Sequence, residues 1–138
     1  MNEEVFEHKA EAKLENLPGI IDFMIVSLKM LGVDDHSTFD IQLAVDEISA
    51  NIIKYAYGDA GGIIRTACRR DGNAILVTIQ DDGYPFDPTR IPPPDLGSDL
   101  EHRKVGGLGV YLAKKVMDSV IYRYENGQNV LTMKKFIK

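Results

Sequence analysis

Glu47 and Asn51 are the first residues of this chain whose types and spacing suit chemistry. They stand four residues apart in the helix-like segment IQLAVDEISANIIKYAY. At about 100° per residue, both fall on one shoulder of its apolar stripe, where the helix should meet the sheet or a loop. A carboxylate can accept a proton, an amide oxygen can bind Mg²⁺, and Lys54, one turn further on, could meet a phosphate. The alternative is a Glu–Asn surface pair beside a solvated lysine, and these residues alone leave both interpretations open.

The stretch VTIQDDGYPFDP brings two more carboxylates to the end of an expected strand. Asp81 closes that strand, and Asp82 and Gly83 begin a loop. A carboxylate at a strand end can accept a hydrogen bond from an amino group on a heterocycle, and a glycine beside it lets the ring approach the backbone. The alternative is a plain turn, in which aspartate and glycine are common.

A glycine cluster in KVGGLGVYLAKKVMD is the third candidate. Gly106, Gly107 and Gly109 precede and open an expected helix, whose free N–H groups and dipole could bind an anion. The alternative is a flexible entry into the helix. The cluster is not a Walker P-loop, because no Gly-Lys-Ser/Thr follows, and it is not a dinucleotide fingerprint, because no strand directly precedes it and position 112 is leucine.

Hydrophobic periodicity and turn signals predict the elements that position these residues. The expected order is strand, helix, helix, strand, strand, long loop, helix, strand, strand. The second helix should open at a capping box over residues 37–40 and run to about Tyr57, and the third should cover about 107–118. Hairpins are expected at Asp71-Gly72 and Asn126-Gly127. Together these features predict an α+β two-layer sandwich, with a mixed, mostly antiparallel sheet and three helices on one face.

Composition limits the function classes. The 138 residues suit a single domain over 1–138, and a net charge of −5 without a basic block argues against nucleic-acid binding. Lys114-Lys115 and Lys134-Lys135 are interpreted as solvated faces. The single cysteine, Cys68, excludes an intrachain disulfide and is expected to be a buried structural thiol. Because no apolar segment is long enough for secretion or membrane insertion, the protein is expected to be cytoplasmic.

Taken in order, the three motifs make the chain resemble the GHKL ATPases of the Bergerat (histidine kinase-like) fold. DEISANIIKYAY resembles the N box, DDG the first glycine box and GGLG the second. The closest likeness is to the stand-alone anti-sigma factor serine/threonine kinases, and it covers about residues 5–136. Residues 82–106 take the place of the ATP lid. Two positions depart from the superfamily pattern, Pro85 in the first glycine box and Val105 before the second.

The resemblance also implies roles for individual residues. Glu47 matches the general base, Asn51 the Mg²⁺ ligand, and Asp81 the carboxylate that recognises the adenine amino group. Gly83 would let the base approach the backbone, and Thr132 would supply a hydroxyl that supports the adenine subsite. The remaining ATP-binding positions implied by the boxes are Lys54, Tyr55, Gly106, Gly107, Leu108 and Gly109.

The implied function is that of an ATP-dependent serine/threonine protein kinase and anti-sigma regulatory factor. It would use ATP and Mg²⁺, phosphorylate an anti-sigma factor antagonist, sequester a sigma factor and form a homodimer. Because the fold takes up nearly the whole chain, there is no room for a module with a phospho-accepting histidine, so the acceptor is expected on another protein. Two alternatives remain: a nucleotide-binding partner-switching regulator with little or no kinase activity, and a pure protein-interaction module.

Overall fold

The computed structural model describes residues 4–55, 61–90 and 107–137, with only the backbone at residues 107 and 108. These ranges contain five strands, three α-helices and two short 3₁₀ helices. In chain order the elements are β1 (Val5–Glu11), η1 (Leu14–Asn16), α1 (Leu17–Met30), α2 (Asp35–Tyr55), β2 (Ile63–Asp71), β3 (Ala74–Asp81), η2 (Pro88–Arg90), α3 (Gly107–Val116), β4 (Ser119–Glu125) and β5 (Gln128–Phe136).

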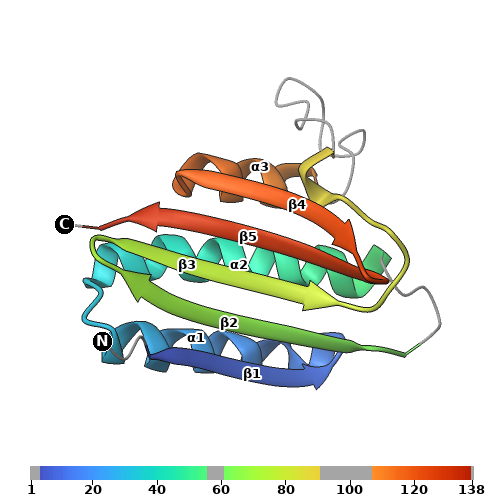
Figure 1. Cartoon of the computed structure of the whole chain (residues 1–138), viewed down its shortest axis with the longest axis horizontal. Coiled ribbons are helices and arrows are strands. Elements are labelled where there is room, and N and C mark those ends of the chain that lie inside the picture. Colours follow the sequence, from blue (N-terminus) through green and yellow to red (C-terminus); the bar gives the residue numbers. More distant parts are fainter. Residues whose placement is uncertain (1–3, 56–60, 91–106, 138) are drawn as a thin grey trace.

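The strands form one sheet in the order β1-β2-β3-β5-β4, and the three helices cover one of its faces (Figure 1). All four neighbouring pairs are antiparallel, so the sheet contains no parallel pair among the described strands. The predicted α+β sandwich is confirmed, and the sheet is more regular than the mixed one expected.

Two tight turns set the strand register. Asn126 and Gly127 have φ values of 55° and 75°, as a type I′ hairpin turn requires, and Gly72 in the first turn has a φ of 61°. The second hairpin turns at Asn126-Gly127 as predicted. The first turns at residues 72–73, one residue later than predicted, because Asp71 still pairs with Ala74. The pairing of β3 with β5 places Asp81 opposite Asn129 and Thr78 opposite Thr132.

Alternation along the strands separates the two faces of the sheet. On β3, Val77 and Ile79 are fully buried beneath the helices, whereas Thr78 and Gln80 point to the uncovered face. Leu131 of β5 continues the buried row. The core consists of such residues together with the apolar stripe of α2, which is formed by Ile41, Ala44, Val45, Ile48 and Ile52.

The start of α2 differs from the prediction. The helix begins at Asp35, because Asp34 Oδ2 accepts a hydrogen bond of 3.0 Å from the backbone N–H of Ser37 and caps the helix one turn earlier. That hydrogen bond also lowers the pKa of Asp34. At the other end, the apolar stripe of α2 does not extend to Tyr55, whose side chain is 46% exposed. The predicted last residues, Ala56 and Tyr57, lie outside the described residues.

Cys68 is buried as predicted. Its side chain is 1% exposed, and burial raises the pKa of the thiol to about 11, so the sulfur is held in its unreactive protonated form. Within the described ranges, no three His, Cys, Asp or Glu side chains are grouped as a metal site would need, and no helix has the length and apolar character to cross a membrane.

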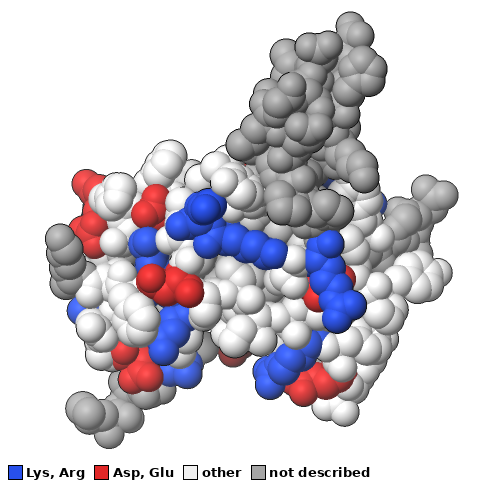
Figure 2. Space-filling model, turned by 90° about the horizontal axis from the view of Figure 1, so that it is seen from above, with Lys and Arg blue, Asp and Glu red and all other residues white. Residues whose placement is uncertain are grey.

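The lysine pairs have local partners. Lys135 is not a solvated residue, because its ammonium contacts Asp40 Oδ2 at 3.2 Å and donates to the carbonyl of Val116 at 2.7 Å, which ties β5 to α2 and α3. Lys114 donates to the carbonyl of Thr89. Seen from above, basic side chains lie beside acidic ones (Figure 2).

Candidate functional site

Four elements that contain candidate residues meet at one end of the molecule. Figure 1 shows the end of β3, the start of β5, the C-terminal part of α2 and the start of α3 at the same end. The loop after β3 joins this group, because the ring of Phe86 contacts the ring of Tyr55 at the end of α2, with centroids 5.8 Å apart. The fold thus gathers motifs that the sequence separates.

Asp81 and Asp82 have different environments. Asp81 is 2% exposed and lies on the helix-covered face, whereas Asp82 is exposed and accepts a hydrogen bond of 3.2 Å from the N–H of Ile63. Oδ2 of Asp81 accepts a hydrogen bond from the N–H of Gly83 at 2.9 Å, so Asp81 also takes part in a turn, as the plain-turn alternative predicts. However, an ordinary turn does not require a buried carboxylate, whose desolvation is costly. This contrast favours a ligand-directed role for Asp81 alone.

Asn129, which the sequence interpretation missed, is the β5 residue that contacts Asp81. Its Nδ2 donates to Asp81 Oδ2 at 3.0 Å, and both side chains are buried. Thr132 pairs with Thr78 on the opposite face of the sheet, so the structure does not bring the Thr132 hydroxyl to the implied adenine subsite. The apolar neighbours Leu131 and Met133 could have shown this, because alternation places position 129 on their face and position 132 on the other.

Glu47 and Asn51 lie together on α2, and Glu47 faces the start of α3. Asn51 is 4% exposed, and its Nδ2 donates to the backbone carbonyl of Glu47 at 2.8 Å. This bond leaves the amide oxygen as the end of Asn51 suited to a cation. Glu47 is half-buried; burial raises the pKa of its carboxyl, with a further rise from Asp46 and an opposing effect from Lys54. A raised pKa makes Glu47 a stronger proton acceptor.

The start of α3 lies directly against Glu47. A Cβ atom added at Gly109 would be 2.0 Å from Glu47 Oε2 and 2.7 Å from its Cδ. No side chain larger than hydrogen fits there while Glu47 keeps this position. The second glycine motif and the proposed base are therefore one structural unit, which their distance in the sequence does not reveal.

Comparisons with known proteins identify the family. The family described as "Histidine kinase-like ATPase domain" matches residues 10–135. The chain belongs to this family. It is 30% identical over 145 residues to proteins named serine-protein kinase RsbW from Bacillus cereus (strain AH820) and Bacillus anthracis, covering 98% of this chain and 86% of each relative. The serine-protein kinase RsbW of Bacillus thuringiensis (strain Al Hakam) shows the same identity and coverage.

A solved structure supports the histidine kinase-like fold independently. The RsbU and RsbW domains of a Mycobacterium tuberculosis protein match with a TM-score of 0.66 at 15% identity, over 96% of this chain. This chain spans 32% of that one. At this level of identity the likeness concerns the fold alone, and it agrees with the arrangement of sheet and helices described above.

Of the remaining predicted ATP-binding positions, some have described side chains and others do not. Lys54 is exposed on the last turn of α2, beside Tyr55. Gly107 begins α3, but its surroundings and the Leu108 side chain are not described. Gly106 lies outside the described residues, and so do Val105 and most of the predicted lid. The described part of that lid contains the 3₁₀ helix η2, and Pro85 is exposed in it.

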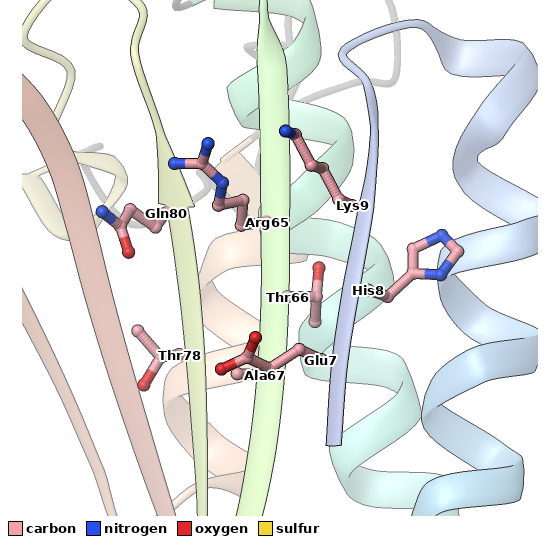
Figure 3. Close-up of a pocket in the computed structure, with 8 residues that line it drawn as sticks. All are labelled: Glu7, His8, Lys9, Arg65, Thr66, Ala67, Thr78 and Gln80. Carbon is pink, nitrogen blue, oxygen red and sulfur yellow. The ribbon is translucent and has the colours of Figure 1, made fainter. Parts of the chain in front are cut away.

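A separate hollow of about 330 Å³ lies on the uncovered face of the sheet. Its lining comes from β1, β2 and β3 and includes Glu7, Arg65, Thr78 and Gln80 (Figure 3). His8 is turned instead toward α1, where its ring stacks on Phe23 with centroids 5.1 Å apart. Because Thr78 and Asp81 point to opposite faces of β3, this hollow is distinct from the candidate site.

Proposed function

We propose that this protein is an ATP-dependent serine/threonine protein kinase that also acts as an anti-sigma regulatory factor. The observation that carries the proposal is the placement of a buried Asp81 and the Glu47–Asn51 pair at one end of a histidine kinase-like ATPase fold. The naming of its relatives as serine-protein kinases over nearly the whole chain supports the same function.

Each residue has a role that its surroundings suit. Asp81 would accept a hydrogen bond from the adenine amino group, and the backbone at Gly83 would allow the base to approach. Asn51 would hold Mg²⁺, which when bound would neutralise phosphate charge. Glu47 would accept the proton of the attacking serine or threonine hydroxyl, while free N–H groups at the start of α3 would bind phosphate oxygens.

The proposed partners are an anti-sigma factor antagonist, which would be the phosphorylated substrate, and a sigma factor, which would be sequestered. We further propose a cytoplasmic homodimer. The antagonist, the sigma factor and the homodimer follow from the family resemblance, whereas the relatives' names support the serine kinase activity. The competing candidate, a nucleotide-binding partner-switching regulator without kinase activity, would use the same adenine-recognition residues but would not need Glu47 as a base.

Incubation with γ-labelled ATP, Mg²⁺ and the co-encoded antagonist tests the proposal. We expect label on a serine or threonine of the antagonist, and none when Mg²⁺ is removed by a chelator. ATP binding without any transfer would support the non-catalytic regulator instead. Absence of both binding and transfer would leave only the interaction module.

Replacement of Gly109 by alanine tests the contact between α3 and Glu47. Because the new methyl group would overlap the Glu47 carboxylate, that side chain must move, and the transfer rate should fall by up to about 100-fold. The free energy of unfolding should change by no more than about 1 kcal/mol, since alanine favours the helix. Single-turnover transfer and thermal unfolding measure the two effects.

Gly19→Ala is the matched control. Gly19 is the third residue of α1, as Gly109 is of α3, and a Cβ added there would meet no atom within 4 Å. The control should stabilise the fold by up to about 1 kcal/mol and leave transfer unchanged. If both substitutions had the same effect on transfer, the close approach of Gly109 to Glu47 would have no catalytic role.

A further inference from the structure

Lys135 is a charged residue on the helix-covered face of the sheet. It lies on β5 two residues after Met133, which is fully buried, so strand alternation turns its side chain toward the helices. That side chain is only 14% exposed. Moving a charge out of water is costly unless the charge is paired and hydrogen-bonded. The place of Lys135 in the fold therefore needs an explanation.

The Lys135 ammonium contacts two helices at once. Nζ lies 3.2 Å from Asp40 Oδ2 on α2 and donates to the backbone carbonyl of Val116 at 2.7 Å. Val116 is the last residue of α3, where carbonyls have no partner within the helix and the helix dipole favours a cation. The Asp40 side chain is 15% exposed, and His36 Nε2 lies farther from its Oδ2, at 3.7 Å. Lys135 therefore ties the end of α3 to α2.

This contact and the contact of Gly109 with Glu47 share one helix register. α2 and α3 run in opposite directions (Figure 1). Asp40 is joined to the level of Val116, and Glu47 lies against Gly109. Asp40 and Glu47 are seven residues apart on α2, and Gly109 and Val116 are seven residues apart on α3. Since seven residues of α-helix rise about 10 Å, the two contacts match along both helices.

The surface between these two contacts is apolar. Ala44 of α2 and Val110 and Ala113 of α3 are buried there. Hydrophobic burial is non-directional, so it holds the two helices together without setting the offset of α3 along α2. Lys114 donates to the carbonyl of Thr89, but that bond attaches α3 to η2 and not to α2. The bonds of Lys135 are therefore suited to set the offset.

We propose that Lys135 is a positioning residue for phosphoryl transfer, an inference that rests on the proposed function. Its bonds to Asp40 and Val116 set the offset of α3 along α2, and this offset holds Gly109 against the Glu47 carboxylate. Lys135 lies at the opposite end of α3 from the proposed base and touches no reacting group. It acts because a misplacement of about 1 Å at a catalytic group can slow a reaction about 10²-fold.

Lys135→Met tests the proposal, because methionine keeps an unbranched apolar side chain but removes the charge and both polar contacts. Single-turnover transfer at saturating ATP should fall by about 10-fold. The same substitution in the Glu47→Gln protein, which has no base to misplace, should lower the remaining rate by less than about twofold. A general loss of stability would instead lower the rate by the same factor in both proteins.

Lys134→Met is the matched control. Lys134 is the neighbouring residue on β5, but it points to the uncovered face, where its ammonium lies 4.9 Å from the centre of the Phe136 ring. Its transfer rate should equal that of the wild type. In the nucleotide-free protein, the amides of residues 110–116 should exchange with deuterium faster in Lys135→Met than in Lys134→Met. This exchange reports the attachment of α3 without any ligand.

Three outcomes would overturn the inference: transfer by Lys135→Met at the wild-type rate, an equal loss in the wild-type and Glu47→Gln backgrounds, or equal amide exchange in the two lysine variants. If Lys135→Met does not fold, Asp40→Asn replaces it and should slow transfer by about threefold or more, so that an unchanged rate there also rejects the inference. Each of these results beside normal wild-type transfer would reject this inference alone. Absence of wild-type transfer would reject the proposed function with it.

Discussion

Asp81→Asn should weaken ATP binding by about 10- to 100-fold. The variant loses the hydrogen bond from the adenine amino group to the charged carboxylate and places a second donor opposite that amino group. In the wild type, Oδ2 of Asp81 accepts from the N–H of Gly83 and from Asn129. In the variant, the new amide oxygen must take over these bonds, so the amide nitrogen would face the adenine amino group. Two donors would then meet, and the loss should be confined to nucleotides that carry the 6-amino group.

Asp82→Asn is the matched control for this result, because it makes the same change at the next, exposed carboxylate. An asparagine there can still accept the hydrogen bond that Asp82 Oδ1 takes from Ile63. Calorimetric titration of both variants with ATP, with thermal unfolding to verify the fold, makes the comparison. Equal affinity of Asp81→Asn and the wild type would remove Asp81 from the adenine site.

Glu47→Gln should leave ATP affinity within about twofold but reduce phosphoryl transfer by about 10²- to 10⁴-fold, the range for loss of a general base. Glutamine keeps the shape against Gly109 but cannot accept the proton. Because burial raises the pKa of Glu47, transfer by the wild type should increase with pH through a range above that of an ordinary glutamate. The group must be deprotonated to act, so activity is lost on the acid side, and this dependence should vanish in the variant.

Asp46→Asn serves as the control for Glu47. Asp46 raises the pKa of Glu47 by charge repulsion, so its removal should shift the acid limb slightly to lower pH and change the maximal transfer rate little. Single-turnover transfer over a pH series measures both quantities. Transfer by Glu47→Gln at the wild-type rate would exclude Glu47 as the base.

The elements with strong local signals were predictable from sequence. Asn126-Gly127 forms the turn expected of it, and Gly72 lies in the first turn, because residues with positive φ are needed at these positions. The apolar residues of α2 recur with the helical period, so they gather on one side of the helix, and that side faces the core. The motif order then led to the correct family, which no single motif could have done.

The errors arise where long-range contacts decide. Thr132 was assigned to the site by its place in a motif, but the pleat of β5 turns it away and presents Asn129 instead. Lys135 looks like a surface residue in sequence, yet its ammonium contacts Asp40 on α2. The packing of Gly109 on Glu47 joins residues from two helices, and only the assembled fold places them together.

The most direct test of the central claim, that these residues form an ATP site, is a calorimetric titration of the wild-type protein with ATP in the presence and absence of Mg²⁺. We predict saturable binding that Mg²⁺ strengthens. Absence of binding at millimolar ATP with Mg²⁺, in a protein shown to be folded, would contradict the account.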